Sequence, residues 1–297
     1  MSFTRFAWGV LAWNLLVVLW GAYVRASGSG AGCGSHWPLC NGEVVPLAPR
    51  IETVIEFTHR LMSGVALVAV AALWFWSRRS FSPDHRARKM ALASVAFLIT
   101  EALLGAGLVL FNYVAKNESV GRAFYLSLHL ANTLLLLAAL ALTAWFSRDD
   151  RVQPRRSPLV MAALPVALLV SVTGAIAALG DTLFPAASLA EGLRQDLSGA
   201  ASFLVRLRVL HPVFAILGAV YFVTVGVIVL RSSQSSVATK LATSVLALAL
   251  AQLCAGAINV LLLAPVWMQI THLLLADLVW IALVLLAVEA QPRMSHG

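Results

Sequence analysis

The sequence predicts an all-α polytopic membrane protein, with eight transmembrane helices arranged as two pseudo-symmetric four-helix bundles. Three observations lead to this prediction. The chain is 60% hydrophobic and only 11% charged. Its apolar residues gather in runs of about 20 residues, the length that crosses a bilayer. The second half of the chain also repeats features of the first half in the same order. Such a composition excludes an ordinary soluble fold.

Each long apolar run is expected to form one membrane-spanning helix. In chain order the runs are 6–27, 53–77, 89–113, 122–146, 158–180, 203–230, 240–262 and 267–289. The first run differs from a cleaved signal peptide, because it is long, Arg5 is the one basic residue ahead of it, and no distinct cleavage site follows. We therefore expect this run to be retained as a helix.

The distribution of positive charge indicates the orientation in the membrane. The net charge is +8, and most of the 21 Lys and Arg lie near the chain ends and in the loops after the second, fourth and sixth runs. Loops rich in Lys and Arg stay in the cytoplasm. We expect a multi-pass protein of the cell (plasma) membrane, bound to the lipid bilayer, with both termini cytoplasmic and no nucleic acid partner. The outer loops are then 28–52, 114–121, 181–202 and 263–266.

The first outer loop contains two of the three cysteines, Cys33 and Cys40. They would face the oxidising side of the membrane, where disulfides form and persist. A disulfide that closes this short loop is therefore expected.

The chain repeats at about half its length. Residues of matching position are Gly21 with Gly174, His59 with His211, Glu101 with Gln252, and His129 with His272. Each copy holds four apolar runs, so both copies have the same orientation and are related by an axis along the membrane normal. We expect an N-terminal bundle over 1–147 and a C-terminal bundle over 148–297.

Four histidines lie within these apolar runs, all near the outer end. They are His59, His129, His211 and His272. Histidine in lipid is costly and is usually functional. Two facing histidines can bind one haem iron from both sides, so the pattern predicts two haem sites, each with one histidine pair. The alternative is that single histidines bond backbone carbonyls. No Cys and His cluster has the spacing of a structural zinc site.

The two predicted sites differ beside the histidine. Glu56 stands three residues before His59, on the same helix face, and Arg208 stands three residues before His211. A carboxylate beside an iron ligand can transfer protons, whereas an arginine suits haem propionates. The first half is therefore expected to be reactive, with Glu56 catalytic. The alternative is that Glu56 only pairs with a nearby arginine, Arg60 or Arg122.

With these residues the chain resembles the haem A synthase family, membrane enzymes of cytochrome oxidase biogenesis. The resemblance covers nearly the whole chain. The motifs that carry it are Val24-Arg25 leading to Gly28-Ser29-Gly30, Cys33 through Trp37-Pro38-Leu39-Cys40, Glu56-Phe57-Thr58-His59-Arg60, His129-Leu130-Ala131-Asn132-Thr133, Arg206-Leu207-Arg208 with His211-Pro212, and His272 through Ala276-Asp277.

The resemblance implies an oxidoreductase that converts a methyl group of haem O to a formyl group by successive hydroxylations, which gives haem A. It implies that His59 and His129 are axial ligands of the substrate haem O, beside an essential Glu56, and that His211 and His272 are axial ligands of a permanent haem B cofactor. Cys33 and Cys40 would be the family's outer-loop pair, as a disulfide or a redox couple. Candidate propionate contacts are Arg25, Arg206 and Arg208.

Some family members carry a second cysteine pair in the third outer loop, and 181–202 has none. A mechanism that needs that pair therefore does not apply here. The implied partners are haem O, haem O synthase and the assembly machinery of a terminal oxidase, and a homo-oligomer is left open.

Two other functions compete with this interpretation. A di-haem electron carrier would need haems near both membrane faces, whereas all four histidines lie toward one face. A non-catalytic haem carrier or assembly factor would share the histidines but would have no need of Glu56.

Overall fold

The computed structural model describes residues 1–148, 157–199 and 201–289, and within these ranges the regular structure is entirely helical. Eight long apolar helices can cross a membrane by length and composition, as the sequence predicts. The chain is therefore a multi-pass membrane protein. The long helices are α1 (Phe3–Ala26), α2 (Ile51–Ser80), α3 (Arg86–Leu110), α4 (Val120–Phe146), α5 (Pro158–Leu183), α8 (Leu210–Ser232), α9 (Ser236–Leu261) and α10 (Val266–Glu289).

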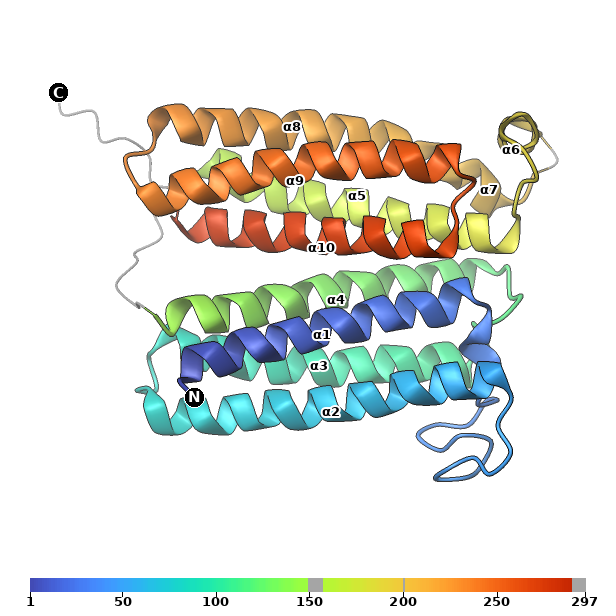
Figure 1. Cartoon of the computed structure of the whole chain (residues 1–297), viewed down its shortest axis with the longest axis horizontal. Helices are drawn as coiled ribbons and strands as arrows, with labels where there is room; N and C mark the ends of the chain where they lie inside the picture. The colour runs from blue at the N-terminus through green and yellow to red at the C-terminus, as the bar shows by residue number, and fades with distance from the viewer. Residues whose placement is uncertain (149–156, 200, 290–297) are drawn as a thin grey trace.

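Three shorter elements lie at the end where the outer loops are expected: η1 (Ser29–Ala31), α6 (Leu189–Leu197) and α7 (Phe203–Arg208) (Figure 1). The apolar run at 203–230 is thus divided between α7 and α8. Pro212 explains the division, because a proline ring clashes with the carbonyl four residues earlier, and that residue is Arg208, the last of α7. The helix restarts at Leu210, which places His211 in the first turn of α8.

Serine side chains begin several of the helices. Ser2, Ser119 and Ser235 each accept a hydrogen bond from the backbone N–H three residues later, at α1, α4 and α9 respectively. Such caps satisfy one of the backbone donors that the first turn of a helix leaves unpaired. These three helices begin close to the start of the apolar run that predicts each of them.

The helices of each half form a closed ring of contacts. Helix α1 contacts α2 and α4, and α3 contacts the same two helices, so α2 lies opposite α4. In the same way α8 lies opposite α10, with α5 and α9 between them. Figure 1 shows the two groups one above the other. We interpret the two rings as the predicted four-helix bundles; the domain boundary at 147/148 stays a prediction.

The most buried helices are α4 and α10, which lie where the two rings meet. Leu134, Leu137, Leu283 and Leu286 are fully buried there, and the indole N–H of Trp280 donates to the carbonyl of Leu134 at 2.6 Å. Within a bilayer such leucines stabilise the contact through van der Waals packing, because lipid is as apolar as the leucine side chain. The two halves therefore share one apolar core.

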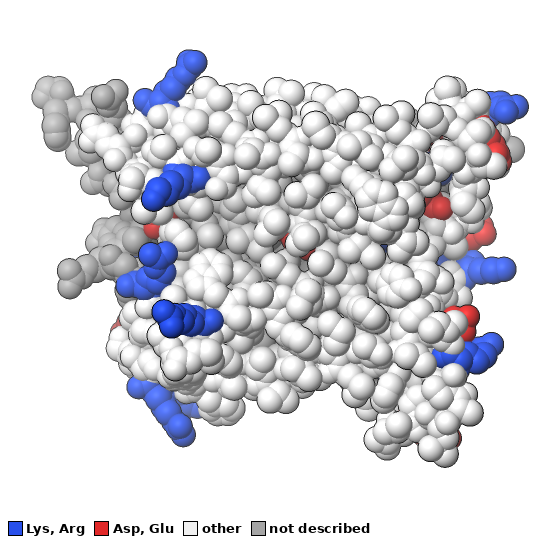
Figure 2. Space-filling view, in the orientation of Figure 1, with Lys and Arg blue, Asp and Glu red and all other residues white. Residues whose placement is uncertain are grey.

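Charged side chains lie mainly at the two ends of the helices. Figure 2 shows Lys and Arg at both ends, with a broad band of uncharged side chains between them. A band of this kind is what a bilayer requires of the surface that faces it.

Candidate functional site

Each of the four intramembrane histidines lies against a glycine of the preceding long helix. The pairs are His59 with Gly21, His129 with Gly105, His211 with Gly174, and His272 with Gly256. Gly21 and Gly174 match in the internal repeat, and Gly105 and Gly256 each stand four residues after a matched residue, Glu101 and Gln252 respectively. The four histidine environments therefore repeat in space as they do in the sequence.

The glycines leave room for the imidazole rings. A Cβ atom at Gly21, Gly174 or Gly256 would lie only 3.0, 2.9 or 3.1 Å from Cε1 of the facing histidine. At Gly105 the nearest ring atom would be 3.7 Å away. Contacts near 3 Å are too close for carbon atoms, so a larger residue at the first three positions would displace the imidazole.

His211 and His272 face each other across the second half, with ring centres 6.4 Å apart. Two histidines that bind one metal ion from opposite sides place their ring centres about 6 Å apart, because each metal–nitrogen bond is about 2 Å. The hydroxyl of Thr173 lies 3.2 Å from Nδ1 of His211. Nδ1 of His272 is buried without a hydrogen-bond partner. The spacing of this pair fits a haem iron.

His59 and His129 lie on α2 and α4, which are opposite helices of the first ring. Nδ1 of His59 is buried and has no hydrogen-bond partner. Nδ1 of His129 lies 3.2 Å from a carboxylate oxygen of Glu101, on α3. The pair therefore has the placement that a ligand between α2 and α4 requires.

Glu56 is buried near the start of α2 and has two partners. One carboxylate oxygen lies 2.5 Å from a guanidinium nitrogen of Arg60, and the other accepts the backbone N–H of Cys33 at 2.9 Å. Arg122 instead donates to the carbonyls of Ala115 and Asn117. Of the two arginines considered from the sequence, Arg60 is the one that pairs with Glu56.

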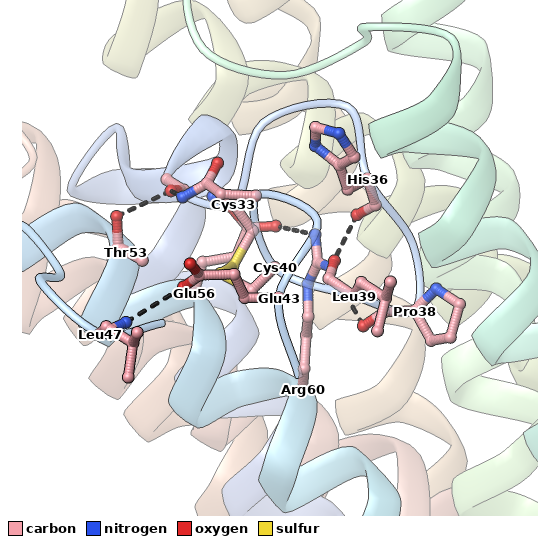
Figure 3. The surroundings of a disulfide bond; sticks show 12 residues. Cys33, His36, Pro38, Leu39, Cys40, Glu43, Leu47, Thr53, Glu56 and Arg60 are labelled. Carbon is pink, nitrogen blue, oxygen red and sulfur yellow. Dashed lines mark hydrogen bonds and ion pairs between the residues drawn. A yellow bond between two sulfur atoms is a disulfide. The ribbon is translucent and has the colours of Figure 1, made fainter. Parts of the chain in front are cut away.

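Cys33 and Cys40 form the expected disulfide, and the loop that it closes is attached to α2. Figure 3 shows Arg60 below this loop, and its guanidinium donates to the carbonyls of His36 at 2.7 Å and Leu39 at 2.6 Å. The hydroxyl of Thr53 donates to the carbonyl of Gly32 at 2.7 Å. Side chains from the first turns of α2 thus hold the loop in place.

Two of the three arginines expected at haem propionates have partners within the protein. Arg25 of α1 donates to the carbonyl of Ala178, the hydroxyl of Thr182 and the amide oxygen of Gln269, at 2.8, 2.7 and 2.9 Å. It therefore joins the first ring to α5 and α10 of the second.

Arg208 pairs with Asp181 at 3.0 Å and with Asp196 of α6 at 2.6 Å. Arg206 is exposed. A propionate at Arg208 would share that side chain with the two aspartates.

From the sequence, Glu101 is expected only to bond across helices, with its role left open; it lies one helical turn before Gly105 on α3 and bonds side chains of α4. The internal repeat pairs Glu101 with Gln252, and this pairing was the signal in the sequence that could have indicated a role for Glu101. The amide nitrogen of Gln252 lies 3.3 Å from Nε2 of His272. Both halves therefore place a polar side chain of the third helix beside the histidine of the fourth.

Comparison with known proteins relates this chain to two differently named enzymes. The chain is 52% identical over 293 residues to a Thermus thermophilus protein named protoheme IX farnesyltransferase, in a match that covers 97% of this chain and 48% of that protein. It is 37% identical over 148 residues to a haem A synthase of Alkalihalophilus pseudofirmus, and 40% identical over 149 residues to one of Shouchella clausii. Each of these two matches covers 49% of this chain and 46% of the relative.

The chain thus spans about half the length of the curated relatives it matches. A family model described as cytochrome oxidase assembly protein matches residues 4–284, which is nearly the whole chain. The chain therefore belongs to the cytochrome oxidase assembly protein family.

Proposed function

We propose that this chain is a haem A synthase, which oxidises a methyl group of haem O to a formyl group. The observation that carries the proposal is the repeated set of histidine and glycine pairs, with a buried carboxylate three residues before the histidine in the first half only. The family and the haem A synthase relatives support the same activity.

In this proposal the two halves have different tasks. His211 and His272 would hold haem B permanently, and their ring spacing of 6.4 Å supports this. His59 and His129 would hold the substrate, haem O. The haem iron would supply the oxidising chemistry when it is bound. The chain itself binds both haems, excludes water with its apolar helices, and handles protons beside the substrate.

Glu56 is the residue that we assign to proton transfer. It is one helical turn from His59, so both side chains leave the same face of α2. Its carboxyl group can take up or give a proton at the substrate methyl group, while the bound haem would supply the oxidising chemistry. Arg60 and the N–H of Cys33 orient the carboxylate.

The name of the Thermus thermophilus relative suggests a second candidate function, prenyl transfer to a haem. This chain matches 48% of that protein, so the activity in its name can belong to the part outside the match. The two names describe different enzymes that act on haem, and an assay with both substrates distinguishes them.

The wider setting is proposed with the activity. The chain would lie in the plasma membrane with both termini in the cytoplasm and the disulfide loop outside. It would receive haem O from haem O synthase and would serve the assembly machinery of a terminal oxidase. The charge distribution along the sequence supports the orientation.

The deciding experiment is co-expression of the full chain with a source of haem O, followed by chromatography of the extracted haems. We expect haem A to form with the wild-type chain and not with His59→Ala. A parallel culture supplied with haem B and farnesyl diphosphate, but without haem O synthase, tests prenyl transfer. Haem O formation in that culture, without haem A in the first, would reject our proposal in favour of the transferase.

A further inference from the structure

The carboxylate of Glu101 lies against one face of α4. One oxygen lies 3.2 Å from Nδ1 of His129 and also accepts the hydroxyl of Thr133. The other oxygen accepts the side-chain amide of Asn132 at 2.6 Å. His129, Asn132 and Thr133 are three and four residues apart, so they share a helix face. One side chain of α3 thus meets three polar side chains of α4.

The two neutral donors hold this carboxylate in a fixed place. Asn132 and Thr133 are both buried, and Asn132 also donates to the backbone carbonyl of Phe97 at 2.8 Å, one turn before Glu101 on α3. Glu101 is half-buried, and a carboxylate that is partly removed from water is costly unless it accepts hydrogen bonds. The first half therefore contains a site built for a carboxylate beside His129.

The described residues of the second half form no such site. Gln252 occupies the position of Glu101, and apolar residues, Leu275 and Ala276, follow His272 at three and four residues. The amide nitrogen of Gln252 lies 3.3 Å from Nε2 of His272, while its amide oxygen is buried without a partner. The two halves therefore differ in the group beside the histidine of their fourth helix. This group is the carboxylate of Glu101 in the first half and the neutral amide of Gln252 in the second.

We propose that Glu101 is a positioning residue for the haem of the first half: it accepts the Nδ1 proton of His129 and directs Nε2 toward the iron. The proposal rests on the function proposed above for His59 and His129. The 3.2 Å contact lacks the alignment of a hydrogen bond, so the proposal includes a rotation of the imidazole that aligns it.

A carboxylate bonded to a metal-binding histidine fixes the ring orientation and raises its basicity. A more basic ligand stabilises ferric over ferrous iron, which lowers the reduction potential. Gln252 carries no net charge and cannot exert this effect on His272. Glu101 thus lowers the reduction potential of the first-half site, an effect that Gln252 does not have on the second.

The test is a redox titration of the purified full chain loaded with protohaem (haem B) as the probe, followed by visible absorption. The titration should resolve one redox component for each bound haem, and the component that is lost in His129→Ala is assigned to the haem of the first half. In Glu101→Gln we expect the ratio of ferric to ferrous affinity at that component to fall about tenfold, which raises its potential by about 59 mV for one electron. The affinity for ferric haem should fall about 10- to 100-fold, while the second component should stay unchanged.

Two further variants separate the effect of the Glu101 carboxylate on the potential from a general disturbance of the packing between α3 and α4. Thr133→Val removes one donor but keeps the carboxylate, so the first-half potential should stay at or below the wild-type value. Thr100→Val alters the neighbouring residue of α3, whose hydroxyl donates to its own helix at Ala96, and should change neither component.

An unchanged first-half potential in a haem-loaded Glu101→Gln variant would overturn this inference and leave the proposed function intact. Absence of any component that depends on His129 in the wild type would overturn both. If Glu101→Gln fails to fold, Thr133→Val decides, because a raised potential in a variant that keeps the carboxylate contradicts the proposal.

Discussion

Glu56 is the side chain on which the proposed activity depends most directly. Its two oxygens bond different groups, Arg60 from the same helix and the backbone of Cys33 from the outer loop. The simple ion pair considered from the sequence therefore exists, and it is compatible with a catalytic role. A substitution that keeps the shape of the side chain separates the two roles.

We predict that Glu56→Gln folds and binds haem but forms no haem A. The glutamine oxygen can still accept the N–H of Cys33, and Arg60 keeps its bonds to the loop carbonyls, so the loss should be confined to proton transfer. Chromatography of haems extracted after co-expression with a haem O source measures this. Glu52→Gln, one turn earlier on α2, is the matched control and should give the wild-type yield. A normal yield of haem A from Glu56→Gln would remove the catalytic assignment.

The glycines that face the histidines allow a second prediction. Gly174→Ala should lower the haem content of the second half, because the new methyl carbon would lie 2.9 Å from the His211 ring. Gly64→Ala meets nothing within 4 Å and should leave haem binding unchanged, with stability equal or higher by up to about 1 kcal/mol. Haem content per chain and thermal unfolding of the two purified variants provide the comparison. Equal haem content in both variants would show that the close contact at Gly174 is not required.

The first turns of α2 and the disulfide loop act together as one structural element. Thr53, Glu56 and Arg60 all bond the backbone of this loop. Hydrogen bonds from α2 therefore hold the outer loop at several points, in addition to the disulfide within the loop itself. The Cys33–Cys40 link adds local restraint to a loop that is already held.

We predict that Cys33→Ser with Cys40→Ser folds and inserts in the membrane, with a modest loss of stability. The chain-entropy model assigns a loop of this length about 2–3 kcal/mol, and the bonds from α2 remain. Thermal unfolding of the purified variant measures the loss, and mass spectrometry under non-reducing conditions tests for the bond in the wild type. Free thiols at both positions in fresh membranes would contradict a structural disulfide.

At the level of the complete molecule, the two helix rings meet along α4 and α10 and each ring holds one histidine pair. Buried leucines and Trp280 lie in the contact surface between them, and the two histidines of each pair come from one ring. The binding of haem in one ring should therefore be separable from binding in the other.

We predict that the double variant His211→Ala, His272→Ala loses the resident haem while the first half still binds added protohaem. In the proposed arrangement each site takes its iron ligands from its own ring, so removal of one pair should leave the other intact. Visible spectra of the purified protein, before and after addition of protohaem, measure both sites. A full and unshifted spectrum in the double variant before addition would show that the histidines are paired wrongly.

Several features of the fold and the site follow from the sequence alone. Hydrophobicity and length are properties of a local segment, so the eight apolar runs predict the eight helices closely. The repeat and the four histidines are equally visible, because corresponding residues keep their order in both halves. The nearness of Cys33 and Cys40 in an outer loop was enough to predict their bond. The short helix α6 and the break before α8 were not predicted, although Pro212 contained the signal for the break.

Other features depend on how each helix is rotated and tilted against its neighbours, which side-chain packing decides. The sequence placed two arginines near Glu56, and only the tertiary structure selects Arg60. It brings Asp181 and Asp196 to Arg208, and it sets each repeated glycine against a histidine. It also brings Glu101 of α3 against α4, because spacing along one helix fixes which residues share a face but not which face of the next helix they meet.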